Sequence, residues 1–325
     1  MMRKREKVED WYRIKFITDW VDFDFELPVE LGHGLILRKA SNGEISIIKE
    51  KKLFHHDVSG KPIYEAFIKN CDYGGIAWVT EVDENKWRYW TIDQGIIDFS
   101  KLKSTAPNQI LSKDNLSYAA SLLDCNLFLG FDIVYNQANN NIISYHPEFK
   151  KVQEANAKPR KPRLVKFEEI EPFSEYLDLI STINNEHEYL TNVIEEFSNL
   201  NIFTSKNKFK TLAKFALIES LLTHNPSDGG DSITKQIKAK VKLLNNRFTK
   251  PIIISDFFKT GSFEKIIGEV YSYRSAIAHG GKYDFSKNNV LESEMKVDHF
   301  INILLRRIII QALREPQLLL DLKDC

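Results

Sequence analysis

The spacing of apolar residues changes near residue 168, and this change limits the possible folds more than any other feature of the sequence. Before it, short β-rich runs alternate with turn signals; after it, apolar residues recur at helical spacing. The sequence therefore predicts an α+β chain, with a mixed N-terminal domain at residues 1–149 and a helical bundle at residues 168–325. With 325 residues, the chain is long enough for two domains of roughly 100–200 residues each.

Three hairpins and one short helix are predicted in the N-terminal half. Asn42-Gly43 is a dipeptide favoured in tight hairpin turns, and the other two hairpins are predicted from β-rich runs around short polar segments. The expected arms are residues 35–40 with 44–48, 75–81 with 86–93, and 127–135 with 142–145. The helix is expected at residues 115–123. Gly32-His33-Gly34 lacks the strand and helix of a phosphate loop, so we expect a turn.

Residues 150–167 are expected to form a linker between the two halves. Residues 150–166 contain two prolines and seven basic residues against the single acid Glu154. Runs of this composition are mostly solvated hinges.

Five helices are expected in the C-terminal half, and the short connections between them favour a bundle. They are residues 173–197, 208–224, 231–247, 262–279 and 292–313. The apolar stretch 301–313 does not qualify as a membrane span, because Arg306 and Arg307 interrupt it.

The charge balance excludes proteins that coat nucleic acid through their net charge, since 45 basic residues face 45 acidic ones. A local basic site is still compatible, because residues 201–250 carry ten basic and three acidic side chains. The three cysteines lack CxxC spacing, and we expect no disulfide framework, metal site or cofactor. The charged residues 1–13 do not form a secretion signal, so we expect a cytoplasmic protein without a membrane partner.

Helix 262–279 carries the residues with the clearest chemical potential. Ser262 is expected to cap its N-terminus, and Gly280 to end it in the left-handed conformation. Arg274 falls on the apolar stripe of the helix, where a guanidinium is costly unless it is paired. His279 lies in the last turn, where the helix dipole favours the imidazolium form.

Two segments resemble a known family. YSYRSAIAHGG, residues 271–281, resembles the motif helix of the HEPN superfamily, in particular of its Apea-like branch. In that branch an aromatic residue precedes an Arg-Ser or Arg-Asn pair, and the histidine is followed by a glycine-rich turn. KFALIESLLTH, residues 214–224, is similar to the second conserved helix of the branch, with Glu219 at the position of its acidic residue. The resemblance covers roughly residues 170–315, and Ser275 stands where the wider superfamily often has Asn.

The resemblance implies a metal-independent endoribonuclease, of the kind found among toxins and antiviral defence effectors, that acts as a homodimer with one composite cleft. It implies that His279 acts on the ribose 2′-OH or the leaving 5′-oxygen, and that Arg274 holds the scissile phosphate. Ser275 and Glu219 would support catalysis, and Tyr273 would contact RNA. These residue types suit the chemistry, since imidazole titrates near neutrality and guanidinium matches phosphate oxygens.

Helix 231–247 offers a surface for the RNA backbone, because Lys235, Lys238 and Lys242 share one face. The opposite face is expected to be apolar and consists of Ile233, Ile237, Val241 and Leu244. The ordinary explanation of such lysines, a solvated face on an amphipathic helix, stays open.

Two other classes of function stay open. HEPN-like domains without nuclease activity serve as modules for dimerisation or partner binding, and the N-terminal domain would then bind a ligand or a regulatory protein. Under this alternative Arg274 is a salt-bridged core arginine and His279 merely ends a helix. A DNA-binding regulator is less favoured, because the sequence shows no helix-turn-helix signature.

Overall fold

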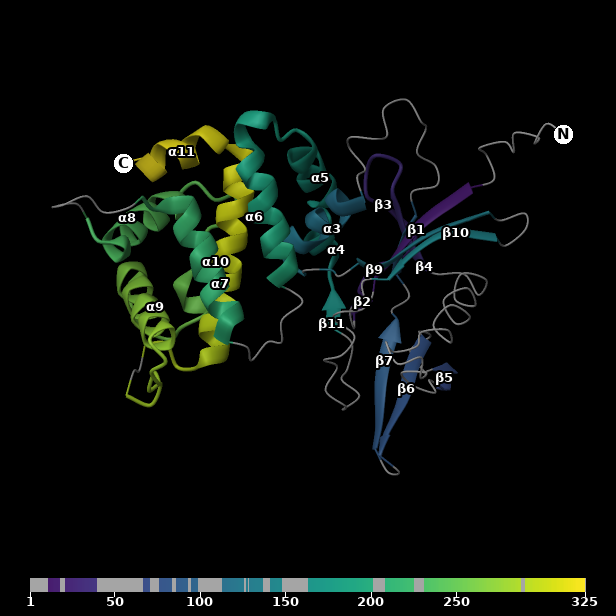
Figure 1. Cartoon of the computed structure of the whole chain (residues 1–325), viewed down its shortest axis with the longest axis horizontal. Coiled ribbons are helices and arrows are strands. Elements are labelled where there is room, and N and C mark those ends of the chain that lie inside the picture. Colours follow the sequence, from purple (N-terminus) through teal and green to yellow (C-terminus); the bar gives the residue numbers. More distant parts are fainter. Residues whose placement is uncertain are drawn as a thin grey trace. The chain divides into compact units, whose positions relative to one another are not determined.

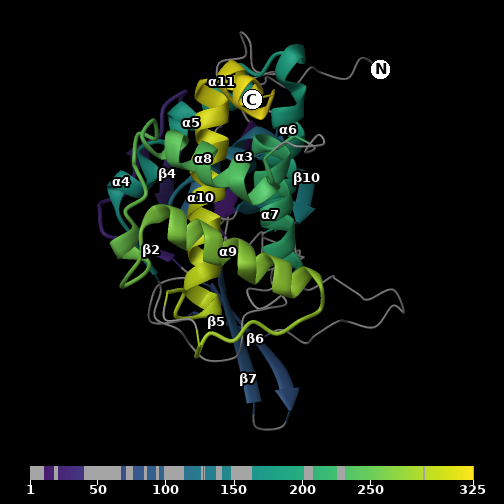
Figure 2. The ribbon, with the colours of Figure 1, turned by 90° about the vertical axis from the view of Figure 1, so that its left-hand side faces the viewer.

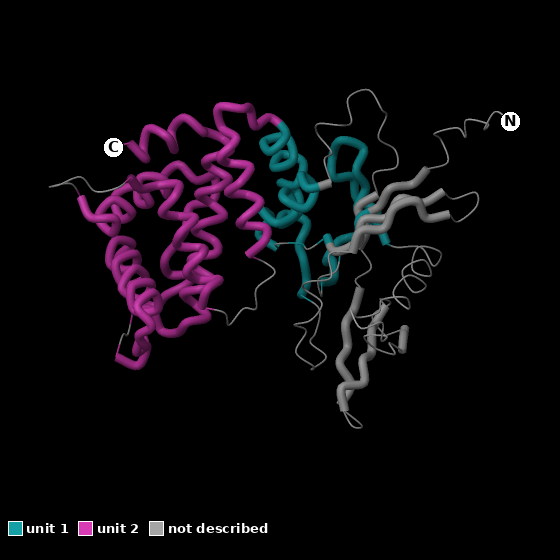
Figure 3. The backbone as a smooth tube through the Cα atoms, viewed as in Figure 1, with its two compact units in different colours: residues 1–181 teal, residues 182–325 magenta. Residues whose placement is uncertain are grey.

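The chain folds into two compact units, residues 1–181 and residues 182–325 (Figure 3). The fold is α+β, with strands and a few helices in the first unit and helices in the second (Figure 1). The computed structural model describes residues 11–17, 21–39, 67–70, 76–83, 86–92, 95–98, 113–125, 127, 129–136, 141–147, 163–200, 208–224, 231–287 and 290–324.

A six-stranded antiparallel sheet is the main sheet of the first unit, in the order β10-β9-β1-β8-β4-β3. Its strands are β1 (Trp11–Ile17), β3 (Val29–Glu30), β4 (Ile36–Lys39), β8 (Gly95–Asp98), β9 (Leu129–Asn136) and β10 (Asn141–Pro147). The pairing of β9 with β10 confirms the hairpin predicted there. Of the hairpin predicted around Asn42-Gly43, β4 is described, and the second arm lies outside the described residues.

A second, three-stranded sheet confirms the remaining hairpin prediction. It consists of β5 (Phe67–Asn70), β6 (Ile76–Asp83) and β7 (Lys86–Ile92), and all its pairs are antiparallel. Asp83 pairs with Lys86, so the two β-rich runs pair as antiparallel neighbours up to the predicted turn.

The division between the units lies later in the chain than the sequence suggests. Part of the expected linker forms the strand β11 (Arg163–Val165), which pairs in parallel with β2 (Val21–Phe23). The helices α4 (Phe167–Ile170) and α5 (Phe173–Ser181) follow, and α5 packs against α3 (Lys113–Leu122). The first helical turns after residue 168 therefore belong to the N-terminal unit, because they cover its apolar residues.

Gly32-His33-Gly34 forms the predicted turn, between β3 and β4. All three residues have positive φ, at 85°, 54° and 74°, and the amide of Leu35 donates to the carbonyl of Gly32 at 2.9 Å. The turn lies against α5, because a Cβ at Gly32 would collide with Ser174 and His33 Nε2 lies 2.9 Å from Asp178 Oδ1. Gly32 is thus required both for its backbone conformation and for the close approach of a helix.

The prediction of a single helix at residues 173–197 is wrong. The chain instead forms α5, a short 3₁₀ helix η3 (Asn185–His187) and α6 (Glu188–Asn199). Asn184 explains the break, since its side chain accepts a hydrogen bond from the amide of His187 at 3.1 Å and caps η3. An asparagine that binds the backbone in this way competes with the ladder of a continuous helix.

The other predicted helices of the C-terminal half are confirmed. They are α7 (Lys208–Leu222), α8 (Ile233–Asn245), α9 (Phe263–Ala278) and α10 (Glu294–Arg314). The short 3₁₀ helix η5 (Ile254–Asp256) and the terminal helix α11 (Pro316–Asp324) were not predicted. In the view of Figure 2, α9 runs crosswise to α10, and α9 packs against both α7 and α8.

The helix α10 forms the centre of the second unit and packs against α6, α7 and α11. From Leu304 to Leu313 every side chain except Arg307 is buried, including the polar Arg306 and Gln311. This position explains the long apolar run in the sequence, because a helix enclosed by neighbours is apolar on all sides. Within the described part of the chain, no helix is long and apolar enough to cross a membrane.

A buried ion pair ties α7 to the start of α10. Lys214 is only 1% exposed, and its ammonium donates to Asp298 Oδ1 at 2.8 Å. Burial lowers the pKa of Lys214, and the neighbouring Asp298 carboxylate opposes this effect. Thr211 also donates to the same carboxylate oxygen, at 3.4 Å. The lysine therefore depends on one aspartate for its charge.

Replacing Asp298 by Ala is expected to lower the free energy of unfolding by about 3–5 kcal/mol, because it leaves an ammonium buried without its counter-ion. Urea denaturation followed by circular dichroism at 222 nm measures the change. Lys214→Met is the control: it should cost clearly less, because it keeps the packing and leaves a carboxylate that is partly exposed. Equal losses for both variants would contradict this account.

Candidate functional site

The helix α9 begins and ends as its sequence predicts. Ser262 caps it by accepting a hydrogen bond from the amide of Lys265 at 3.4 Å. His279 is the C-cap, and Gly280 follows with a φ of 72°. The amide of Gly280 donates to Ile277, and that of Gly281 donates to Ala276 at 2.8 Å. These two hydrogen bonds end the helix at its C-cap, His279, whose side chain is exposed.

Arg274 and Glu219, which are far apart in the sequence, meet between α9 and α7. The guanidinium Nη2 donates to Glu219 Oε2 at 3.1 Å. The arginine side chain is 35% exposed and the glutamate side chain 16%. The expectation that an arginine on this stripe needs a partner is met, and one edge of its guanidinium still reaches the surface.

A second contact between the same helices lies one turn away. The rings of Tyr271 on α9 and Phe215 on α7 meet edge to face, with centroids 5.3 Å apart. Tyr271 precedes Arg274 by three residues and Phe215 precedes Glu219 by four, so each pair shares a helix face. Burial raises the pKa of Tyr271, and the negative charge of Glu219 raises it further. Tyr271 therefore stays protonated beside the ion pair.

The structure brings only some of the predicted catalytic residues together. Arg274 and Glu219 are in contact, whereas Ser275 and His279 are both exposed further along α9. Among the described residues, no hydrogen bond or ion pair links His279 to Arg274 or Glu219. Within one chain, then, the exposed His279 imidazole and the partly exposed Arg274 guanidinium lie on the same helix without a hydrogen bond or ion pair between them.

Tyr273 is turned into the protein. It is 2% exposed, its hydroxyl donates to Glu294 Oε1 at 3.0 Å, and burial raises its pKa. Its ring packs against Tyr283 and Phe285, which belong to the segment after the glycine turn. This burial removes Tyr273 from any surface that an RNA chain could contact. The ring instead fixes the segment that follows His279.

The lysines of the predicted face of α8 each have a neighbour, but the side chains of Lys235 and Lys242 stay 71% and 60% exposed in surface ion pairs. Lys235 pairs with Asp231 at 2.6 Å, and Lys242 pairs with Glu264 of α9. The ammonium of Lys238 lies over α9, where it would be 2.7 Å from a Cβ at Gly268.

The opposite face of α8 is mostly apolar, as predicted, but the polar Gln236 and Lys240 are buried on this side of the helix as well. Ile237, Val241 and Leu244 are buried, but Ile233 is exposed at the first turn of the helix. The helical period places Ile233 on the apolar face, but as the first residue of α8 it is 37% exposed.

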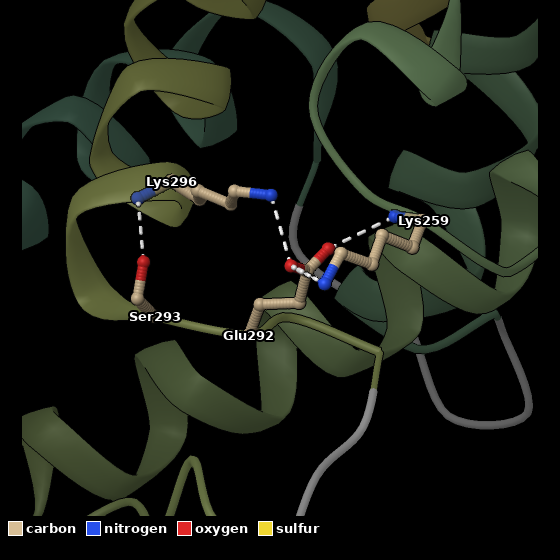
Figure 4. A network of polar contacts seen from close by, with 4 residues as sticks. All are labelled: Lys259, Glu292, Ser293 and Lys296. Carbon is tan, nitrogen blue, oxygen red and sulfur yellow. Dashed lines mark hydrogen bonds and ion pairs between the residues drawn. The ribbon is translucent and has the colours of Figure 1, made fainter.

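A network around Glu292 anchors the chain between α9 and α10 (Figure 4). The Glu292 carboxylate accepts from the backbone amide of Lys259 at 2.9 Å and from the Lys296 ammonium at 2.9 Å, and the Lys259 ammonium lies 3.7 Å away. Ser293 caps α10 by accepting from the amide of Lys296. Glu292 itself has a φ of 59°, unusual for a residue with a side chain. These contacts hold it in that conformation.

Sequence reasoning missed the residues that support the site rather than form it. Tyr271, Phe215 and Glu294 were not predicted to have a role. The spacing of three residues between Tyr271 and Arg274 was the available signal for the first of them. The partners on other helices carried no such signal, because their contacts exist only after the bundle forms.

Comparisons with protein-family models, with curated proteins and with solved structures found no match. Within the described part of the chain, no group of three or more His, Cys, Asp or Glu side chains is placed to hold a metal ion.

The Glu292 network makes stability depend on acid pH in a defined direction. Hydrogen bonds from Lys296 and from the Lys259 amide lower the pKa of Glu292. A carboxylate with a lowered pKa stabilises the fold above its ordinary range, and this contribution disappears as the pH falls through the lowered value. Replacing Glu292 by Gln is therefore expected to lower the melting temperature at pH 7. The deficit relative to the wild type should shrink between about pH 5 and about pH 3.

The measurement is a series of thermal melts of both proteins across that pH range. Gln keeps the size and the backbone strain of position 292, so the difference between the proteins reports the charge. Melting temperatures that run parallel at all pH values would show that the carboxylate does not stabilise the fold through its charge.

Proposed function

We propose that this chain is a metal-independent HEPN endoribonuclease of the Apea-like branch, acting as a toxin or antiviral defence effector, with residues 182–325 as the core of its HEPN bundle. The observation that carries the proposal is the Arg274–Glu219 ion pair on a helix that ends at an exposed histidine. These are residues to which the resemblance assigns catalytic or supporting roles. In this proposal the first unit is the sensing or regulatory domain.

The proposed reaction needs two kinds of side chain. His279 takes the proton of the ribose 2′-OH, whose oxygen attacks phosphorus while the bond to the 5′-oxygen breaks. The leaving 5′-oxygen gains a proton, and the products carry a 2′,3′-cyclic phosphate and a 5′-hydroxyl. Arg274 binds the non-bridging phosphate oxygens and stabilises the charge of the transition state. DNA lacks the 2′-OH and is not a substrate.

A dimer supplies the full set of groups. One imidazole cannot both take the 2′ proton and give the 5′ proton at once, but two copies of α9 that meet across a two-fold axis provide two. The exposure of His279, Ser275 and one edge of Arg274 is compatible with such a composite cleft. Glu219 orients the guanidinium in each copy.

One observation favours a second candidate, a HEPN module that dimerises or binds a partner without cleaving RNA. The Arg274–Glu219 contact is also what a purely structural arginine needs, and it satisfies the charge without any ligand. The two candidates differ in what removal of His279 does, because an exposed helix-ending residue has no structural task.

We expect the purified protein to cleave single-stranded RNA in the presence of EDTA. His279→Ala should reduce the rate at least about 100-fold, because it removes general acid–base catalysis. Arg274→Ala should reduce it by about 100- to 1,000-fold, because it removes transition-state charge stabilisation. Product ends are identified by mass spectrometry as 2′,3′-cyclic phosphate.

The matched controls are Arg247→Ala and His187→Ala. Arg247, like Arg274, forms an ion pair with a glutamate, in this case Glu315 at 2.8 Å. Arg247 and His187 both lie on segments of the second unit other than α9. Both controls should cleave RNA like the wild type. Undiminished cleavage by His279→Ala, or a monomer at micromolar concentration by light scattering, would contradict the composite site. Intact RNA bound by the wild type would favour the binding module.

A further inference from the structure

The hydroxyl of Tyr271 is buried and has no hydrogen-bond partner among the residues that the structure describes. Tyr271 is 7% exposed, and among the described residues no group donates to or accepts from its oxygen. A buried polar group without a partner loses its hydration and gains nothing in return, so native proteins contain few of them. A phenylalanine would fill the same space without this cost. We therefore expect the Tyr271 hydroxyl to form a hydrogen bond in another state of the protein.

The surroundings of Tyr271 point to the Arg274–Glu219 pair. The ring of Tyr271 packs on Phe215, one turn from Glu219 on α7, and Tyr271 lies one turn from Arg274 on α9. Both charges act on the phenol, since Glu219 raises its pKa and Arg274 opposes that effect. The phenol is thus a protonated hydrogen-bond donor close to a carboxylate whose present partner is Arg274.

The hydrogen bonding between Glu219 and Arg274 is weaker than such a pair allows. A single hydrogen bond, from Nη2, joins the two side chains, and the buried Nε atom of Arg274 has no partner in the described part of the chain. A two-pronged arginine–carboxylate pair would be stronger and more fixed. The guanidinium can therefore turn toward a competing anion at its exposed edge, but Glu219, which is mostly buried, would then lose its donor.

We propose that Tyr271 is a positioning residue that exchanges with Arg274 on Glu219. When an RNA phosphate takes the guanidinium, the Tyr271 hydroxyl donates to the Glu219 carboxylate in its place. In the resting state Arg274 binds Glu219, and no described residue binds the Tyr271 hydroxyl. In the RNA-bound state both the hydroxyl and the Glu219 carboxylate have a partner. The inference rests on the proposed function for its ligand, a phosphodiester of single-stranded RNA. No proton is transferred, because the phenol donates a hydrogen bond and keeps its hydrogen.

The test uses the full chain and a single-stranded RNA with methylated 2′-hydroxyls, which cannot be cleaved by the proposed route. Tyr271→Phe should bind this RNA about tenfold more weakly than the wild type, because Glu219 would be left without a donor in the bound state. Its melting temperature without RNA should equal or exceed that of the wild type. A merely structural tyrosine predicts the reverse: a lower melting temperature and unchanged binding.

A double-mutant cycle with Glu219→Gln shows whether Tyr271 acts through Glu219. In Glu219→Gln the side chain at position 219 is a neutral amide, which needs a hydrogen bond from the Tyr271 hydroxyl less than the Glu219 carboxylate does. Tyr271→Phe should therefore change the RNA affinity less than twofold in the Glu219→Gln background. Tyr189→Phe is the matched control: its hydroxyl on α6 is also buried without a partner among the described residues. The melting temperature of Tyr189→Phe should equal or exceed that of the wild type, and its RNA affinity should be unchanged.

The outcomes separate this inference from the proposed function. If the protein binds the methylated RNA through Arg274 but does not cleave ordinary RNA, the proposed nuclease function is wrong. The exchange is then still tested by the RNA affinity of Tyr271→Phe. Undiminished RNA affinity of Tyr271→Phe overturns the exchange, and so does an equal loss in the wild-type and Glu219→Gln backgrounds. Binding that Arg274→Ala does not weaken also overturns it, because Arg274 would then not hold the phosphate.

Discussion

The packing of α9 against α7 depends on the ion pair between Arg274 and Glu219. The two helices bury apolar side chains on either side of this pair, and a guanidinium among them is acceptable only with a counter-charge. Because the pair is close to the surface, Glu219 neutralises the charge of Arg274 while part of the arginine side chain stays exposed to solvent. The same contact thus serves the packing of the bundle and leaves an arginine edge for an anion.

Other polar contacts hold the ends of the helices around this pair. Lys214 and Asp298 join α7 to α10, and the Tyr273 hydroxyl joins α9 to α10 through Glu294. Glu292 fixes the backbone just before α10 begins. Lys214 and Tyr273 are buried, and Asp298 and Glu292 are mostly buried, so these groups need their partners for the helices to pack. Tyr273 also packs against Tyr283 and Phe285, and these ring contacts hold the segment after His279.

The sequence predicted the local elements well, because their signals are local. The caps Ser262 and Gly280, five of the predicted helices (α3 among them) and two hairpins follow from residue spacing and turn chemistry. The predictions failed where a distant contact or a single side chain decides. Asn184 divides the helix predicted at 173–197, and the packing of α5 on α3 moves the division between the units to residue 181.

The sequence by itself determined that Arg274 needs a partner and that a glycine turn places His279 at a helix end, because both follow from helical period and backbone preference. Only the tertiary structure decided that Glu219 is that partner and that Tyr273 faces inward. It also decided that the Tyr271 hydroxyl is buried beside the pair. These facts depend on how two helices, separated by many residues, lie against each other, and no local pattern encodes the orientation of side chains across such an interface.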